Sequence, residues 1–327
     1  MFTLTSTLRK SMIHLAIRQI CRGMIYFFMI KSQRKGHYLE ITVPEKWAGI
    51  TIEELLKNIY KAPKKLVHEW RMAKDILLSG TPANWTQALQ KGEQLYLPLY
   101  KHEVTLPEAA FIDISVLYED DDLLVVNKPA GIETHPSEQG QNQSLLNAVA
   151  YHLLIEGENC ELRHIHRLDK DTTGAILFSK NAFAGAILQQ MLDERTIKRT
   201  YKALVHGKLS QRKGTISSNI GRDRHHATRR RVSPTGQTAV THFETLHYNR
   251  KDDLTLVQCT LDTGRTHQIR VHLSSIGHPL AGDTLYGGEP IFPRQALHAC
   301  KIQFNHPITE ENIEIEAPFI DTPPIFK

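Results

Sequence analysis

The chain has 327 residues, of which 41% are hydrophobic and 23% charged, so it is long enough for two globular domains and too apolar to be disordered. Its four cysteines lie far apart with no C-x-x-C pair, which argues against a disulfide framework or a cysteine-rich zinc site and indicates a reducing compartment such as the cytoplasm. The net charge of +5 does not make the whole chain basic, because residues 1–36 hold seven basic side chains and no acidic one, which leaves 33 basic against 35 acidic residues in the remainder.

Residues 1–36 form this acid-free leader. Its longest apolar run, Met24–Ile30, is too short for a membrane span, which takes about 20 residues, and no small-residue cleavage site follows it. We therefore expect neither secretion nor a membrane anchor. The leader fits an Arg-rich organellar transit peptide or sequence translated upstream of a true start at Met24 or Met29. We favour the second interpretation and predict that residues 1–36 have no part in the fold.

A small α/β module is predicted over residues 37–105. Apolar residues alternate over 39–43, as in a short strand. Thr51 and Glu54 are spaced as a capping box at the start of an amphipathic helix. A second helix is expected over 64–73, with short strands at 77–78 and 95–97. A module of about 65 residues is near the lower size limit for folding alone.

A polar linker is predicted over 101–107, followed by one larger domain over 108–320. We expect strands at 123–127, 174–179, 199–206, 240–246 and 254–261, and helices at 144–155, 181–194 and 266–275. Strands outnumber helices and do not alternate strictly with them. The pattern predicts an α+β fold with a mixed, largely antiparallel sheet.

The densest cluster of charged residues is Arg163–Gly174, which holds two histidines, two arginines, a lysine and two aspartates just before an apolar strand. Such a run is often only a solvated face. However, Asp169 lies close to Arg167 in a loop that ends in small residues, and a nearby cation favours the charged carboxylate. An ionised and partly buried Asp169 is a usable nucleophile or base.

A second cluster is Thr263–His272, where Thr263 and Gly264 end a strand and a helix is expected to follow. Arg265 and His272 are spaced to share one helical face, which is an exposed basic face in the simplest interpretation. An arginine at a helix N-terminus opposes the helix dipole, so we expect Arg265 to bind an anionic ligand instead.

A third cluster is a run of arginines in a loop bounded by Gly, Ser, Pro and Thr. Its members are Arg222, Arg224, Arg229, Arg230 and Arg231. Arginine suits bidentate phosphate contacts and stacking on bases, so the run predicts an arm that binds RNA or phosphate. The alternative is a flexible surface loop.

Several common sites are missing from the sequence. It contains no G-x-x-x-x-G-K-[ST] loop, no G-x-G-x-x-G after a strand and no G-x-S-x-G, so it has no motif for nucleotide hydrolysis, dinucleotide redox chemistry or acyl transfer. The eighteen histidines could be paired as metal ligands, for example His164 with His166, but no H-E-x-x-H motif accompanies them. We therefore predict no metal and no cofactor.

Five segments resemble, in chain order, motifs of the RluA-type RNA pseudouridine synthases. They are VNKPAG at 126–131 with HP at 135–136, HRLD at 166–169 with TTG at 172–174, KRTYKALVHG at 198–207, TGRTHQIRVH at 263–272, and GHPLAGDTLYG at 277–287. The resemblance covers residues 108–320, nearly the whole larger domain. The number and order of these motifs make it highly specific.

The resemblance implies a role for each matching residue. Asp169 is expected to be the catalytic aspartate, Tyr201 the tyrosine that stacks on the uracil and helps proton transfer, and Arg270 the cation paired with Asp169. The base pocket and its rim are expected to hold Ile269, Arg167, Arg265 and His166 as substrate-binding residues. Two positions depart from the usual pattern: Thr173 stands where Ser is usual and keeps a hydroxyl, and Gln237 stands where Lys is usual and lacks its charge.

The N-terminal module resembles the S4-like RNA-binding module that often precedes this catalytic domain. Residues 77–80 and 91–95 fit its pattern, whereas the usual opening Arg-Leu-Asp is replaced by Ile52-Glu53-Glu54. The lysines of its two predicted helices would supply phosphate contacts.

The resemblance implies that the chain isomerises specific uridines to pseudouridine. No atom enters or leaves in this reaction, so no cofactor is needed, and the target base must be extruded into a pocket. We expect ribosomal RNA as the partner, with transfer RNA as the alternative, and a monomeric enzyme. A second hypothesis is an RNA-binding ribosome-assembly factor whose catalysis is secondary or lost. Asp169 would either attack C1′ or remove the 2′ proton, and residue identity does not decide between these roles.

Overall fold

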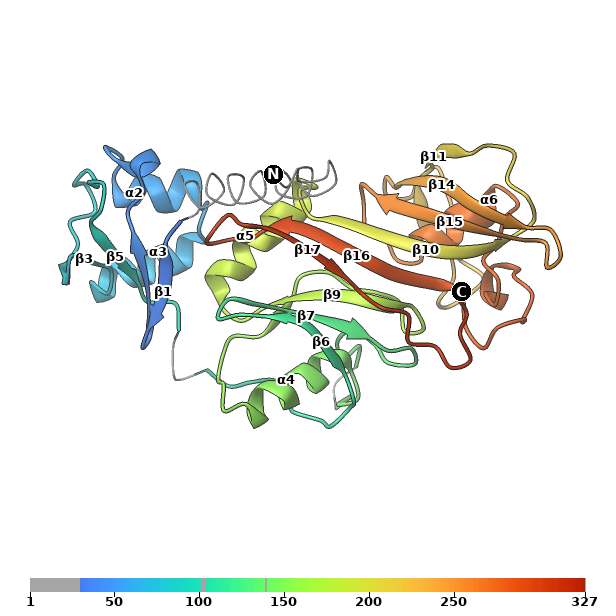
Figure 1. Cartoon of the computed structure of the whole chain (residues 1–327), viewed down its shortest axis with the longest axis horizontal. Helices are drawn as coiled ribbons and strands as arrows, with labels where there is room; N and C mark the ends of the chain where they lie inside the picture. The colour runs from blue at the N-terminus through green and yellow to red at the C-terminus, as the bar shows by residue number, and fades with distance from the viewer. Residues whose placement is uncertain (1–29, 101–103, 139, 327) are drawn as a thin grey trace, which may run out of the picture.

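The computed structural model describes residues 30–100, 104–138 and 140–326 (Figure 1). Within these ranges the chain forms an N-terminal module with a five-stranded sheet and a larger domain with a ten-stranded sheet. Among the pairings described, β9 and β16 run parallel and the other neighbours antiparallel. The predicted α+β class with a mixed, largely antiparallel sheet is confirmed. No helix in the described part of the chain is long and apolar enough to cross a membrane.

The N-terminal module packs short helices on a small sheet, as predicted. Its strands, in spatial order, are β1 (Ser32–Lys35), β2 (Tyr38–Thr42), β5 (Gln94–Leu97), β3 (Leu77–Leu78) and β4 (Thr81–Pro82). Its helices are η1 (Glu45–Trp47), α2 (Ile52–Glu54), η2 (Leu55–Ile59) and α3 (Lys64–Ala73). The predicted capping box is present: the Thr51 side chain accepts from the Glu54 backbone N–H, and Glu54 accepts from that of Thr51.

The prediction that residues 1–36 take no part in the fold is wrong for the last residues of this leader. Ile30 is buried in the core of the N-terminal module, and β1 pairs in register with β2, Ser32 opposite Ile41. This strand was missed because its side chains are polar and mostly exposed, so no apolar alternation marks it. The rest of the leader, residues 1–29, and part of the predicted linker, residues 101–103, lie outside the described residues.

The larger domain is built on strands of which β10 and β16 lie roughly along the long axis of the view (Figure 1). In spatial order the main strands are β11 (Lys213–Ser217), β14 (Val240–Asn249), β15 (Leu254–Leu261), β10 (Lys198–His206), β16 (Leu297–Asn305), β9 (Thr173–Ser179), β7 (Leu123–Lys128) and β6 (Ser115–Glu119). Strand β17 (Asn312–Glu316) pairs with β16, and β8 (Arg163–His164) pairs with β9. The other elements are α4 (Leu145–Ile155), α5 (Ala182–Asp193), α6 (Gln268–Ser275), η3 (Thr284–Tyr286) and the hairpin of β12 (Ile220–Arg222) with β13 (Arg230–Val232).

Strand β7 shows how both faces of this sheet are covered. All of its residues are buried, and they alternate between two cores. Leu124 shares one cluster with residues of α4, and Leu123 shares another with Leu188 of α5. Successive side chains of a strand point to opposite faces, so the two helices cover opposite sides of the sheet at this end. A continuous apolar run is the expected sequence of such a doubly covered strand.

The C-terminal boundary predicted at residue 320 is too early. Ile325 and Phe326 are buried in a small cluster, and Asp321 pairs with the buried Arg294 at 2.7 Å. The chain therefore stays packed against the larger domain to the last described residue.

The N-terminal module shares a hydrophobic core with the larger domain. Phe183 of α5 lies 5.0 Å from the ring of Tyr60 and 5.7 Å from that of Trp70, measured between ring centroids. Ile308, which follows β16, is fully buried in the same cluster. Docking thus adds apolar burial to a module near the lower size limit for independent folding.

A polar cluster joins the two parts beside this core. The buried Asp122 carboxylate accepts hydrogen bonds from the Tyr100 hydroxyl (3.1 Å) and the Asn181 amide (2.8 Å). Next to it, Asp120 accepts from His306 Nε2 at 3.1 Å, while His306 Nδ1 accepts from two backbone N–H groups. Burial and the charge of Asp120 raise the pKa of Asp122 to about 6.

We predict that Asp122→Asn stabilises the protein at neutral pH. Because the folded-state pKa of Asp122 lies above its ordinary value of 3.8, the folded protein holds a proton that the unfolded chain has lost, and wild-type stability falls as pH rises from about 4 to about 6. The amide removes this loss, on the order of 2 kcal/mol. Thermal unfolding measured from pH 4 to 8 checks it. The matched control is Asp121→Asn at an exposed surface pair with Arg34. Equal pH profiles for wild type and Asp122→Asn would contradict the prediction.

Candidate active site

Asp169 lies in the loop between β8 and β9, and this loop is held by contacts to its backbone. The Thr134 hydroxyl donates to the Leu168 carbonyl and accepts from the Leu168 N–H, both at 3.1 Å. The Thr172 N–H donates to the Asp169 carbonyl at 3.0 Å, which closes a turn around the aspartate. These bonds depend little on loop side chains, so they set the position of Asp169 through the main chain.

Lys128 anchors the same loop from the end of β7. Its side chain is fully buried, and its Nζ donates to the carbonyls of Pro129 (2.8 Å) and Lys170 (2.7 Å). Burial lowers the pKa of Lys128 to about 8. The lysine in the VNKPAG motif therefore links the segment after β7 to the loop that holds Asp169, because its ammonium group donates to a carbonyl oxygen of each.

Strand β9 begins directly after the loop and requires glycine there. A Cβ on Gly174 would lie 2.3 Å from the Ala299 carbonyl oxygen, and the Gly174 φ of +115° is one that residues with side chains rarely adopt. The adjacent Thr173 is fully buried, and its hydroxyl contacts His298 Nδ1 at 2.7 Å and Arg294 Nη2 at 2.9 Å. The hydroxyl that Thr173 shares with the usual serine thus makes two hydrogen bonds.

Arg270 on α6 brings two carboxylates together. Its Nη1 donates to Asp169 Oδ2 at 3.2 Å, and its Nε and Nη2 donate to the two carboxylate oxygens of Asp283 at 2.7 and 2.8 Å. Burial lowers the pKa of Arg270. The hydrogen bond to Asp283 and the charges of both aspartates raise it by more than burial lowers it, so the net shift is upward. The predicted pair of Arg270 with Asp169 is present in the structure.

Asp283 was not predicted as a site residue. It lies in the motif at 277–287, and its side chain is almost fully buried against Arg270. Tyr286, three residues further on, covers the Arg270 guanidinium at 5.0 Å and contacts His267 Nδ1 through its hydroxyl at 2.8 Å. Its position inside a quoted motif was a signal for such a role, but only the fold shows that its partner is Arg270.

Asp169 faces a small cavity of about 50 Å³ that also contains Tyr201, Ile269 and Arg270. Tyr201 of β10 and Ile269 of α6 are both buried, 4% exposed each, and supply apolar surface. Burial raises the pKa of Tyr201, so its hydroxyl stays protonated near neutral pH. Arg167 and Arg265 border the same cavity. The structure therefore brings together six of the seven residues predicted for catalysis and substrate binding.

His166 is the exception. It is buried outside this cavity, and its Nε2 accepts a hydrogen bond from the Leu177 N–H at 3.3 Å. Burial and the charge of Arg199 lower its pKa well below the usual value, so it is neutral. Its contact with β9 favours a structural role over the predicted contact with substrate.

Helix α6 differs from its prediction. It begins at Gln268, and His267 before it has a φ of 58°, so Arg265 lies outside the helix and does not share a face with His272. Gln268 and His272 are buried and both contact Thr241. The helix has no exposed basic face over this stretch, because these polar side chains bind the sheet.

The predicted arginine arm is a β-hairpin. Arg222 pairs with Arg230 across β12 and β13. The Arg230 N–H donates to the Tyr286 hydroxyl at 2.8 Å, and the Arg229 guanidinium lies 5.7 Å from the Tyr286 ring, so the hairpin reaches the cover of the catalytic pocket. Arg222, Arg224 and Arg231 remain exposed. Residues 223–229 connect the two strands as a loop, so the choice between an RNA-binding arm and a surface loop stays a prediction.

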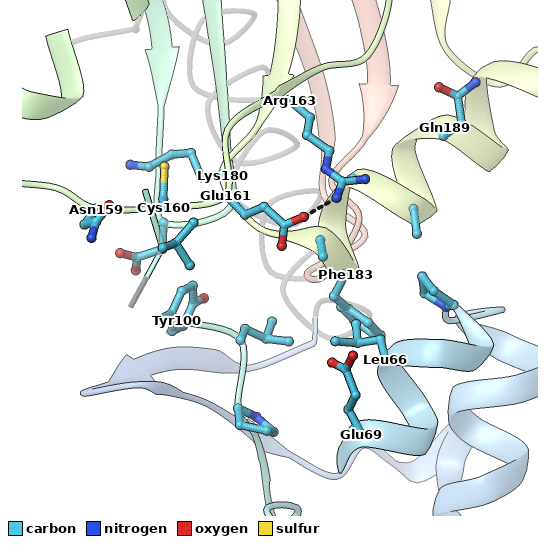
Figure 2. Close-up of a pocket in the computed structure, with 18 of the residues that line it drawn as sticks. Leu66, Glu69, Tyr100, Asn159, Cys160, Glu161, Arg163, Lys180, Phe183 and Gln189 are labelled. Carbon is cyan, nitrogen blue, oxygen red and sulfur yellow. Dashed lines mark hydrogen bonds and ion pairs between the residues drawn. The ribbon is translucent and has the colours of Figure 1, made fainter. Parts of the chain in front are cut away.

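A larger cavity, of about 460 Å³, lies between the N-terminal module and α5 (Figure 2). Leu66 and Tyr100 line it from the module, and Phe183 and Lys180 from the larger domain. No residue predicted for catalysis lines it, whereas Lys65 of α3, one of the lysines predicted to contact RNA phosphates, does. Size therefore does not identify the reactive site of this protein.

Two family models match the chain. The model described as RNA pseudouridylate synthase matches residues 122–275, which include Asp169, Tyr201 and Arg270, and that of the RluD ribosomal pseudouridine synthase N-terminal domain matches residues 39–95. An RNA pseudouridine synthase of Bacillus subtilis, YhcT, is 50% identical over 88% of this chain and 95% of its own length. The chain belongs to the RluA-type RNA pseudouridine synthases. It is therefore an isomerase that acts on RNA.

Other relatives agree with this assignment. Ribosomal large subunit pseudouridine synthase D of Nitrosomonas europaea is 36% identical over 89% of this chain and 87% of its own length. The solved structure of human RNA pseudouridylate synthase domain containing 1 is 27% identical, with a TM-score of 0.55, over 66% of this chain and 88% of that one. The synthase fold predicted from the motifs is confirmed, and the N-terminal module corresponds to the RluD N-terminal domain.

We predict that Asp283→Asn lowers the rate of pseudouridine formation at saturating RNA by about a hundredfold, because Arg270 loses the carboxylate that orients it toward Asp169. Unfolding free energy should fall by about 3 kcal/mol as a buried ion pair is broken. Single-turnover conversion and thermal unfolding measure the two effects. The matched control is Glu119→Gln, which breaks an ion pair with the buried Lys180, and neither of these two residues lines the catalytic cavity. An equal rate loss in both variants would reduce the role of Asp283 to stability.

Proposed function

We propose that this enzyme isomerises a uridine of large-subunit ribosomal RNA to pseudouridine, with Asp169 as the essential catalytic residue. The observation that carries the proposal is the position of the Asp169 carboxylate, which faces a buried cavity and bonds Arg270 at 3.2 Å. Ribosomal RNA is favoured over transfer RNA because relatives that align over most of the chain bear the name ribosomal large subunit pseudouridine synthase, and because the N-terminal module matches the RluD type.

The site supplies one carboxylate with restricted motion. The buried guanidinium of Arg270 holds Oδ2 of Asp169, and the turn at Thr172 fixes its backbone. Asp169 then attacks C1′ of the target uridine or removes its 2′ proton, and either route starts from the ionised carboxylate. After the N1–C1′ bond breaks, the base rotates and rejoins through C5.

Holding the base during this rotation requires an enclosed apolar surface. Tyr201 and Ile269 provide it, and aromatic stacking on a base contributes about 1–3 kcal/mol, comparable to the few kcal/mol lost when a nucleotide leaves its stack. Arg167 is exposed at the rim of the cavity. From there it would lie beside the flipped nucleotide and help to hold it out of the RNA.

The arginine hairpin extends the positive surface beyond the cavity. Because Arg222, Arg224 and Arg231 are exposed, they can approach phosphates of the same RNA. None of these three arginines lines the catalytic cavity, so we assign them to RNA binding, with no part in the chemical step.

We predict that Asp169→Asn abolishes isomerisation and leaves RNA affinity within about twofold of wild type, because the amide keeps the shape of the side chain and loses the nucleophile or base. Pseudouridine mapping in ribosomal and transfer RNA, from cells with the wild-type protein, the variant or none, identifies the target uridine. Turnover by Asp169→Asn near the wild-type rate would refute its role. A site that maps to transfer RNA alone would refute the proposed substrate.

Replacing Arg222, Arg224 and Arg231 together by Ala is predicted to weaken RNA binding and leave the saturated single-turnover rate unchanged. Each phosphate contact on single-stranded RNA adds about −0.7 to the slope of log affinity against log salt, so three lost contacts flatten it by about two units. Binding titrations at several salt concentrations measure the slope. An unchanged slope would assign RNA binding to other surfaces.

A further inference from the structure

A second groove opens beside the catalytic cavity. Its volume is about 410 Å³, and it shares Arg167, Arg199, Gly264 and Arg265 with that cavity. Its other walls come from the loop before Asp169, the C-terminal end of α5 and the end of β15. A ligand in the catalytic cavity can therefore continue into the groove.

Several cations of the groove have no carboxylate partner in the described part of the chain. Of its two aspartates, Asp262 lies 3.6 Å from Arg195 and 3.2 Å from His242 Nε2, and Asp193 accepts from the Gln189 amide. Among the described residues, neither Arg167 nor Arg265 has an ion-pair partner, and the Arg265 Nε donates only to the Thr238 carbonyl. The shared wall of the two cavities is thus positively charged.

Arg199 of β10 is the most informative of these residues. It is 9% exposed, and its Nε has no hydrogen-bond partner in the described part of the chain. No ion pair involving it is present there either. A buried charge without partners is costly, so such a guanidinium is expected to meet an anion in the functional complex.

The position of Arg199 restricts where that anion lies. A Cβ on Gly264 would be 3.3 Å from Arg199 Nη1, so the absence of a side chain at Gly264 leaves room for the guanidinium. Arg199 lines both the catalytic cavity, which holds Tyr201, and the groove, which holds His166, so it lies between the base pocket and the groove. An RNA phosphate adjacent to a base held by Tyr201 has the charge and the position to meet Arg199.

We propose that this groove is a phosphate subsite, in which Arg199 binds the RNA phosphodiester next to the target uridine. The subsite rests on the proposed function, because its ligand is the backbone of the RNA whose uridine enters the catalytic cavity. Guanidinium groups form bidentate hydrogen bonds to phosphate, and a lysine at the same place would give only a point charge. The contact would hold the flipped nucleotide in register with Asp169.

The test uses the full-length enzyme and an RNA oligonucleotide that contains the mapped uridine, with one neutral methylphosphonate linkage introduced at each neighbouring position in turn. Arg199→Met should weaken binding about tenfold, as expected for a charged hydrogen bond, and flatten the salt slope by about 0.7. A methylphosphonate at the contacted linkage should weaken binding to the wild type by a similar factor. Combining the two changes should cause no further loss.

Controls separate this result from a structural effect. Arg163→Met removes an exposed arginine that pairs with Glu161 outside the groove, as Figure 2 shows, and should leave affinity and salt slope unchanged. Arg199→Lys should retain the salt slope and recover only part of the affinity. If Arg199→Met does not fold, the methylphosphonate scan with the wild type still decides, since no effect at any neighbouring linkage overturns the subsite.

The outcomes also distinguish the two proposals. If the affinity loss from Arg199→Met adds to the loss from the methylphosphonate at every linkage, Arg199 binds elsewhere and the subsite is overturned. The proposed function still stands in that case if the wild type converts the oligonucleotide. Failure of the wild type to convert any ribosomal RNA overturns both.

Discussion

The shared guanidinium of Arg270 holds the active site together. It binds Asp283 through two hydrogen bonds and Asp169 through one, and all three side chains are largely buried. One cation between two carboxylates leaves a net negative charge, and the less enclosed carboxylate, that of Asp169, faces the cavity. Asp283 therefore neutralises and orients the arginine, while Asp169 remains available to react. Removing Arg270 would leave two buried carboxylates without the cation that they share.

This arrangement requires a catalytic loop that cannot drift relative to α6. Thr134 and Lys128 hold the loop through its carbonyl groups, and Gly174 lets β9 approach the backbone of Ala299 closely. These contacts come from segments well separated along the chain. The sheet brings them together, so the positions of Asp169 and Arg270 depend on correct packing of the whole larger domain.

Arginines at the catalytic cavity differ from several other arginines in their ion pairing. Some exposed arginines are paired with acids, as Arg163 is with Glu161. Around the catalytic cavity, Arg167, Arg199 and Arg265 have no such partners in the described residues. A polyanion gains most where cations are not already neutralised. The pattern of paired and unpaired arginines thus favours one path for RNA across a chain whose body beyond residue 36 is nearly neutral.

The sequence alone determined the family, the fold class and most site residues, because the motifs are local runs and the periodicity of helices such as α3 is local too. It did not reveal β1, whose polar side chains carry no alternation, or the hairpin that orders the arginine run. It suggested His166 as a substrate-binding residue, although His166 is buried against β9 and accepts a hydrogen bond from the Leu177 N–H. Only the tertiary structure joined Asp283 to Arg270 and left Arg199 without a counter-ion among the described residues, because ion pairing depends on distances between segments that the sequence does not encode locally.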